Sequence, residues 1–79
     1  MEMILIASLS PTYAEKTVRL LNNNGVRARR VALPRELAEG GCTAGVLAEG
    51  VGRREILGLL QSRRVPFRKI IPLGKEGIG

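Results

Sequence analysis

The stretch Leu20-Leu21-Asn22-Asn23-Asn24-Gly25-Val26 decides the expected fold, because its pattern returns as Leu59-Leu60-Gln61-Ser62-Arg63-Arg64-Val65. The second copy starts about half a chain length after the first in a sequence of 79 residues. A basic pair and an apolar residue follow each copy, as Arg29-Arg30-Val31 and Arg68-Lys69-Ile70. The sequence therefore indicates two similar halves, each with a helix end followed by a strand.

Hydrophobic patterning outside the repeat predicts the remaining elements. Met3–Ala7 is a continuous apolar run, which is typical of a central strand. Ser10 and Pro11 form a helix start, with a capping hydroxyl and a proline in the first turn. Gly25 suits the left-handed position that follows a helix. The other expected elements are strands over 26–33, 43–48 and 67–73 and a helix over 53–64.

The order β-α-β-β-α-β predicts an α+β fold, the ferredoxin-like two-layer sandwich. Its antiparallel four-stranded sheet carries both helices on one face. We expect residues 1–73 to form a single domain and residues 74–79 to form a flexible Gly-rich tail. The first and third strands are expected in the centre of the sheet. The basic pairs of the repeat then lie on the two edge strands, where charge discourages aggregation between sheets.

The expected first strand is apolar on both of its faces. Ile4 and Ile6 point to one face, whereas Met3, Leu5 and Ala7 point to the other. Because the helices cover one face only, we expect a second copy of the chain to cover the other, giving a homodimer. A domain of this size buries only about 60% of its unfolded surface, which also favours association. The alternative is a small exposed apolar patch.

The composition excludes several kinds of chemistry. The chain has no His and 1 Cys, so it lacks a Ser-His or Cys-His pair, a structural zinc site and an internal disulfide. We therefore expect no enzyme, no catalytic residue, no metal and no cofactor. Its start has the acidic Glu2 and only a short apolar run, unlike a signal peptide. With its single Cys, the chain is expected in the cytoplasm and away from membranes.

Cys42 is the residue most suited to chemistry. Gly40 and Gly41 precede it and Gly45 follows it, and this glycine frame leaves the sulfur accessible at the end of a central strand. A thiolate persists at neutral pH only in positive potential, which Arg35 supplies and Glu36 opposes. Glu36 is also a candidate orienter through an ion pair. The alternative is a buried Cys that serves as a small hydrophobic residue.

Gly25-Val26, Leu33-Pro34-Arg35-Glu36-Leu37 and Gly41-Cys42 together carry a resemblance. The chain resembles the small bacterial family described as selenium/sulfur carrier-like over nearly its whole length. The resemblance implies that Cys42 carries sulfur or selenium, with Pro34, Arg35 and Glu36 as the accompanying loop and donor and acceptor proteins as partners. The family usually has Gly directly after the Cys, where this chain has Thr43. One Cys is sufficient for a carrier, because a second would release the cargo by forming a disulfide.

Two other functions stay open. The net charge of +6 permits non-specific nucleic-acid binding, although Tyr13 and Phe67 are too few for a base-stacking pair on the sheet. The loops near Gly40–Gly45 or Gly50–Gly52 permit a regulatory domain that binds a small metabolite at a dimer interface. We also single out Gly50, Gly52, Arg53 and Arg54 as a candidate anion-binding turn at a helix start. The alternative for that turn is a Gly-containing connection with no ligand.

Overall fold

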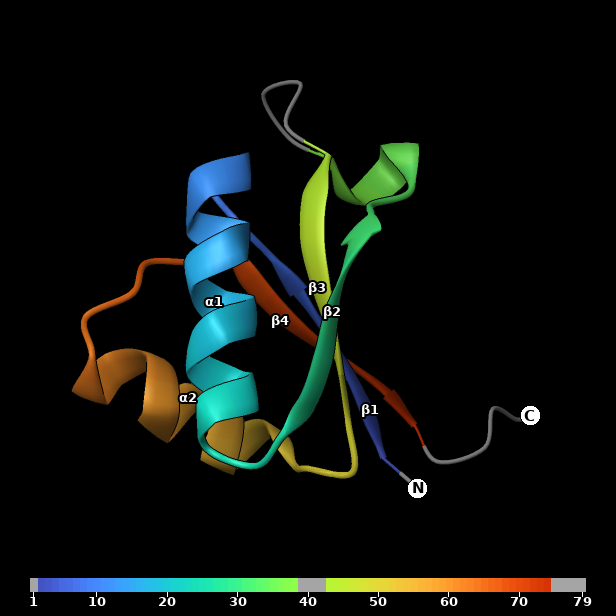
Figure 1. Ribbon diagram of the computed structural model, residues 1–79. Helices are drawn as coiled ribbons and strands as arrows, with labels where there is room; N and C mark the ends of the chain where they lie inside the picture. Colours follow the sequence, from blue (N-terminus) through green and yellow to red (C-terminus); the bar gives the residue numbers. More distant parts are fainter. Residues whose placement is uncertain (1, 39–42, 75–79) are drawn as a thin grey trace.

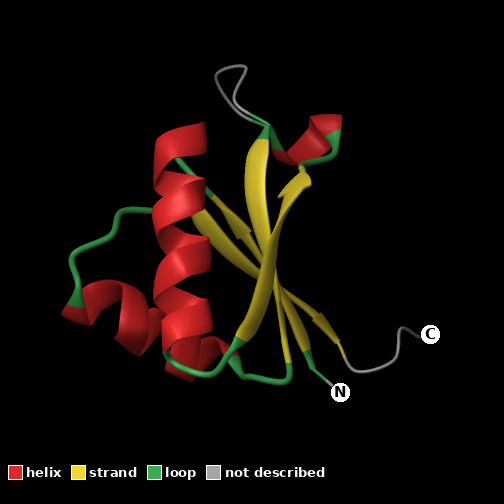
Figure 2. Cartoon of the chain, in the orientation of Figure 1, coloured by secondary structure: helices red, strands yellow, loops and turns green. Residues whose placement is uncertain are grey.

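The sheet of this protein has one face covered by both helices. In the computed structural model, residues 2–38 and 43–74 are described (Figure 1). The elements are β1 (Met3–Ala7), α1 (Pro11–Asn23), β2 (Arg27–Ala32), the 3₁₀ helix η1 (Arg35–Leu37), β3 (Ala44–Glu49), α2 (Arg53–Ser62) and β4 (Lys69–Gly74). Both α-helices lie on the same side of the sheet (Figure 2). This arrangement confirms the predicted α+β ferredoxin-like βαββαβ sandwich.

The strand order is β2-β3-β1-β4, and all neighbours are antiparallel. The first and third strands are therefore central, as predicted from the apolar run of β1. Leu5 in β1 lies opposite Leu47 in β3 and Ile71 in β4. Because side chains alternate along a strand, these three residues share the face away from the helices.

The helix-covered face holds the larger of two apolar clusters. Ile4 and Ile6 of β1 pack there against Leu21 of α1 and against Ile56 and Leu60 of α2. All five are at most 2% exposed. The predicted division of β1 into two apolar faces is confirmed, since Leu5 and Ala7 belong to a separate cluster on the opposite face.

The opposite face is partly covered by the chain itself, which the sequence analysis did not predict. Leu33 packs on Leu5 and Ala7, with Leu37 and Ala38 beside them. Leu33 is 5% exposed, Leu5 7% and Ala7 0%. Residues 33–38 therefore fold back over one end of the open face and contain η1.

The ends of the two helices repeat the same geometry. Val26 N donates to Leu21 O at 2.9 Å after α1, and Val65 N donates to Leu60 O at 2.9 Å after α2. The residue before each valine is left-handed, with φ of 79° at Gly25 and 56° at Arg64. This six-to-one hydrogen bond is characteristic of a Schellman helix end. The repeat read from the sequence thus corresponds to a structural repeat.

The end of α2 and the start of β4 differ from the prediction by two residues, and the other predicted strand boundaries differ by at most one. The helix expected over 53–64 ends at Ser62, because the chain turns into the left-handed Arg64. No glycine marks this turn, unlike the end of α1. The strand expected from Phe67 begins at Lys69. Phe67 instead packs against the helix-side cluster.

Substitutions at the left-handed residues of the two helix ends, Gly25 and Arg64, are expected to change stability in opposite directions. Gly25→Ala should lower the free energy of unfolding by about 1 kcal/mol, because a side chain in this conformation is strained. A Cβ at Gly25 would meet nothing within 4 Å, so crowding does not contribute. Arg64→Gly should raise the free energy by about 0.5 kcal/mol, since strain relief exceeds the entropic cost of glycine. Urea unfolding measures both values.

Gly58→Ala is the matched control for these variants. Gly58 lies inside α2 and a Cβ there would also meet nothing within 4 Å. Its Ala variant should be stabilised by about 0.5–1 kcal/mol, because alanine favours the helix. A stabilised Gly25→Ala protein would contradict the assigned role of Gly25.

Candidate functional site

The predicted sulfur-carrying Cys42 lies outside the described residues, as do Gly40 and Gly41. The residues on both sides of this segment are described. Leu33 N donates to Thr43 O at 2.8 Å, which extends the β2–β3 ladder one pair beyond Ala32 and Ala44. The two elements on either side of this segment, η1 and the start of β3, therefore lie at one end of the sheet (Figure 1).

The supporting residues predicted before Cys42 lie at the surface. Pro34, Arg35 and Glu36 are all exposed. Leu37 N donates to Pro34 O at 3.0 Å and Ala38 N donates to Arg35 O at 3.2 Å, which closes the single turn of η1. In the described part of the chain, no ion pair joins Arg35 to Glu36. The turn is fixed by its backbone hydrogen bonds and by the packing of Leu37.

Gly45 lies within β3, where it permits close packing. A Cβ on Gly45 would lie 2.6 Å from Leu33 Cδ2 and 2.9 Å from Leu33 Cγ. Real side chains do not approach so closely, so any other residue would displace Leu33. The sequence analysis placed Gly45 in a glycine frame around Cys42. The structure assigns it a contact that holds the start of the 33–38 segment on the sheet.

The candidate anion-binding turn already has a carboxylate beside it. The backbone N–H of Gly50 donates to the backbone carbonyl O of Glu2 at 2.8 Å. A Cβ on Gly52 would lie 3.2 Å from Oε1 of the Glu2 carboxylate. Gly52 caps α2 without a side-chain hydrogen bond. The positive end of the helix dipole favours an anion at this place. Arg53 and Arg54 are exposed at the start of the same helix.

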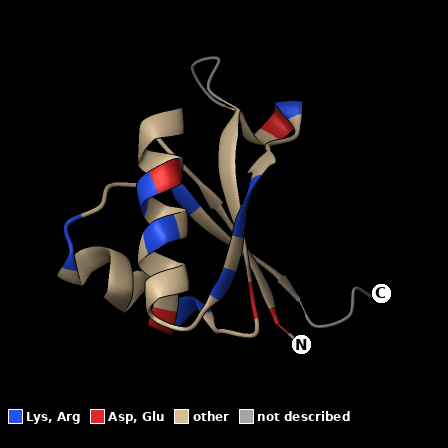
Figure 3. Cartoon of the chain, viewed as in Figure 1, with Lys and Arg blue, Asp and Glu red and all other residues tan. Residues whose placement is uncertain are grey.

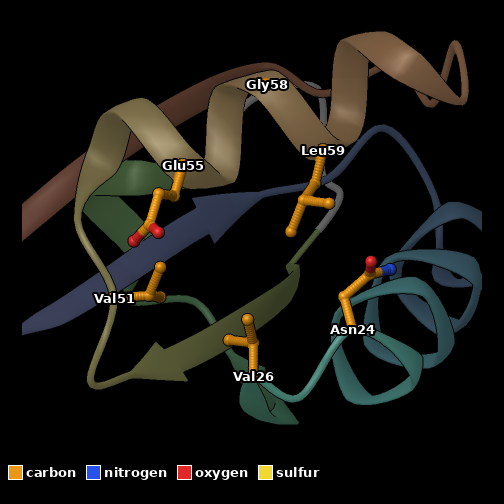
Figure 4. A pocket seen from close by; sticks show the side chains of 6 residues that line it. All are labelled: Asn24, Val26, Val51, Glu55, Gly58 and Leu59. Atoms are coloured by element: carbon orange, nitrogen blue, oxygen red, sulfur yellow. The ribbon is translucent and has the colours of Figure 1, made fainter.

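A cavity of about 370 Å³ opens between α2 and the connection from α1 to β2. Figure 4 shows Val26, Val51 and Leu59 around it, with Glu55 and Asn24 on opposite sides. Asn24 Nδ2 is already bonded to Leu20 O at 2.8 Å. Of the lining side chains, only Glu55 is charged, and it is exposed. The cavity adjoins the Gly50–Gly52 turn to which the metabolite alternative assigned a ligand.

Basic residues follow one another along β2, at the edge of the sheet (Figure 3). Arg27 and Arg29 are exposed and stand opposite Glu49 and Leu47, on the face away from the helices. Arg30 points the other way, and its Nη1 lies 3.3 Å from Glu15 Oε2 on α1. Positive charge therefore lies on both sides of this edge.

Three further findings concern metal ions, membranes and relatives. Residues 2–38 and 43–74 contain no cluster of three or more His, Cys, Asp or Glu that would hold a metal ion. None of the helices in this part of the chain is long and apolar enough to cross a membrane. Comparisons with protein families, curated proteins and solved structures find no match to this chain. The fold thus defines the class, a small α+β ferredoxin-like sandwich.

Proposed function

We propose that this chain is a carrier that accepts sulfane sulfur or selenium on Cys42 and passes it to a partner protein. The observation that carries the proposal is the anchoring of both flanks of the Cys42 segment. The backbone N–H of Leu33 is hydrogen-bonded to Thr43 O, with an N–O distance of 2.8 Å, and Leu37 and Ala38 pack on the sheet. A thiol in a segment whose two flanks are fixed suits transfer between proteins.

The proposed transfer requires one thiolate and no cofactor. The Cys42 thiolate attacks the terminal sulfur of a donor persulfide, forming a Cys42 persulfide and releasing the donor thiolate. An acceptor thiolate then attacks the terminal sulfur of the Cys42 persulfide. That sulfur passes to the acceptor as a persulfide, and the Cys42 thiolate is regenerated. For selenium the same steps pass through a selenosulfide. The exposed Pro34, Arg35 and Glu36 support this role, because a donor protein can reach this end of the sheet.

Incubation with a cysteine desulfurase and cysteine is expected to add one sulfur atom to the protein. Intact-mass measurement detects the adduct, and a thiol reductant removes it. Cys42→Ala should abolish the adduct, because the chain has no other Cys. Thr43→Ala is the matched control and should retain it. An unmodified wild-type protein under conditions that load the desulfurase itself would reject the carrier function.

The proposal includes a cytoplasmic location and a homodimer. A free carrier thiol needs a reducing compartment, which the cytoplasm supplies. Met3, Leu47 and Ile71 remain only half-buried on the open sheet face, and this surface is available to a second copy. The 33–38 segment makes the surface smaller than the sequence analysis expected. The concentration dependence of stability, treated in the Discussion, tests this part.

The nucleic-acid alternative is less well supported than the carrier. Tyr13 lies on α1, where its ring faces Lys16 Nζ at 5.6 Å, and Phe67 packs in the helix-side core. Neither aromatic residue is thus available to stack a base on the sheet. The remaining basis for this alternative is charge alone.

A further inference from the structure

The two edges of the sheet differ in how well they resist an added strand. β4 contains Pro72, and its register with β1 shifts between Met3 and Ile4. Proline and irregular register both hinder pairing with a further strand. β2 has no proline, and its register with β3 is regular from Arg27 to Ala32. β2 is therefore the edge on which a strand can be added.

The hydrogen-bond pattern defines which groups of β2 point outward. The bond from Leu33 N to Thr43 O continues the β2–β3 register, so Leu33, Val31 and Arg29 direct their backbone groups toward β3. Arg30 and Ala32, which alternate with them, direct their N–H and C=O groups away from the sheet. Both residues are exposed. The outer edge thus presents an alternating row of donors and acceptors.

One end of this edge is already occupied. The N–H of Ala28 also points outward, and it donates to Asn22 Oδ1 at 3.2 Å. The Asn22 side chain therefore closes the end of β2 near α1 and leaves Arg30–Ala32 open. This open stretch continues into Leu33, whose partner Thr43 directly follows Cys42 in the chain.

Charge determines the kind of strand that the edge accepts. Arg27 and Arg29 are exposed on one side of β2, and within the described residues neither makes a side-chain hydrogen bond or an ion pair. The chain has a net charge of +6. Two β2 edges would bring arginines against each other, whereas an acidic strand would be attracted.

We propose that Arg30–Ala32 binds an acidic extended segment of the donor protein as a fifth strand of the sheet. This inference rests on the proposed carrier function for its partner, because such a strand would lie beside Leu33, which is hydrogen-bonded to Thr43, the residue that follows Cys42 in the chain. The pairing is β-augmentation, in which main-chain hydrogen bonds give affinity. A polypeptide backbone matches alternating donors and acceptors, whereas phosphates of a nucleic acid only accept.

A soluble peptide of alternating Glu and Val is the probe, titrated into ¹⁵N-labelled protein at low salt. Saturating peptide should slow hydrogen exchange of the Arg30 and Ala32 amides at least about 10-fold, because both become hydrogen-bonded. The amide of Val31 should change much less, since it already faces β3. The same peptide with Lys in place of Glu should not bind. Unchanged exchange at Arg30 and Ala32 with bound peptide would overturn the proposal.

Two pairs of variants separate backbone pairing from charge. Ala32→Pro removes an outward N–H without changing charge and should weaken peptide binding about 10-fold, as expected for one lost hydrogen bond plus the proline ring. Ala32→Val keeps the N–H and should bind like the wild type. Arg27→Glu with Arg29→Glu should abolish binding. The control is the double variant Arg53→Glu and Arg54→Glu, which makes the same change of net charge on α2. It should bind the peptide with only a modest loss of affinity.

A single-stranded oligothymidylate provides the competing arm of the test. If it binds as tightly as the peptide and Ala32→Pro binds both normally, the edge is a non-specific polyanion surface and the proposal is wrong. Cys42→Ser should bind the peptide like the wild type. Peptide binding without a sulfur adduct on the wild type would therefore reject the carrier but keep the edge. A sulfur adduct on the wild type without peptide binding would reject the proposed edge and keep the carrier function.

Discussion

Leu33→Ala is expected to lower the free energy of unfolding by about 2–5 kcal/mol, the range for removing a buried leucine side chain. Leu33 is 5% exposed, although it lies on the sheet face that has no helix. Its loss would uncover Leu5 and Ala7 and detach the start of the 33–38 segment. Denaturant unfolding measures the change. Leu73→Ala is the matched control, because Leu73 is 45% exposed, and it should cost less than about 1 kcal/mol.

Gly45 tests the same contact from the opposite side. Gly45→Ala should destabilise the protein by about 1–3 kcal/mol, since its Cβ would lie 2.6 Å from Leu33 Cδ2. In the double variant with Leu33→Ala, the added methyl group no longer meets the Leu33 side chain and keeps only its approach to Ile6 O at 3.3 Å. The two costs should therefore not add, and the double variant should be only slightly less stable than Leu33→Ala alone. Additive costs would mean that Leu33 and Gly45 do not share this contact.

A destabilised 33–38 segment should also affect the proposed chemistry. Leu33 N is bonded to Thr43 O, so the Leu33→Ala protein loses part of the packing that holds one flank of Cys42. The contact between Leu33 and Gly45 thus connects the packing of the open face with the hydrogen bond to Thr43, the residue that follows Cys42 in the chain.

Local signals in the sequence were sufficient for most of the fold. Ser10 Oγ accepts from Tyr13 N at 3.3 Å and Pro11 begins α1, as the Ser-Pro pair predicted. Gly25 ends the helix in the left-handed conformation. These features depend on residues close together in the chain. Because the second half repeats the first, the strand order followed from the same signals.

The features that sequence reasoning missed depend on contacts between distant residues. Leu33, Leu37 and Ala38 have a spacing that suits one buried side of a turn, but the polar Arg35 and Glu36 between them gave no indication that this side packs on the sheet. Their burial depends on β1, far away in the sequence. Glu2 lies beside Gly52 for the same reason, and nothing in either local sequence indicated it. The residue type at Arg64 does not indicate its left-handed conformation, because glycine is the usual residue there, and only the alignment of Arg64 with Gly25 in the repeat points to it.

Ile6→Ala is expected to lower the free energy of unfolding by about 2–5 kcal/mol at every protein concentration. Ile6 is 0% exposed in the central strand β1, and it lies between the sheet and both helices. Because its cavity would form inside one chain, association with a second copy cannot restore the lost contacts. Thermal and urea unfolding at several concentrations measure the effect.

Leu47→Ala is the matched substitution on the opposite face and tests the proposed homodimer. Leu47 is half-buried in β3 and stands opposite Leu5 on the face away from the helices. If a second copy covers this face, the wild-type melting temperature rises with protein concentration, since dimerisation stabilises the folded state by mass action. Leu47→Ala should weaken or remove that rise, whereas Ile6→Ala should preserve it. A wild-type melting temperature that stays constant over a 100-fold range of concentration would show that the open face belongs to a monomer, and the 33–38 segment would then be its main cover.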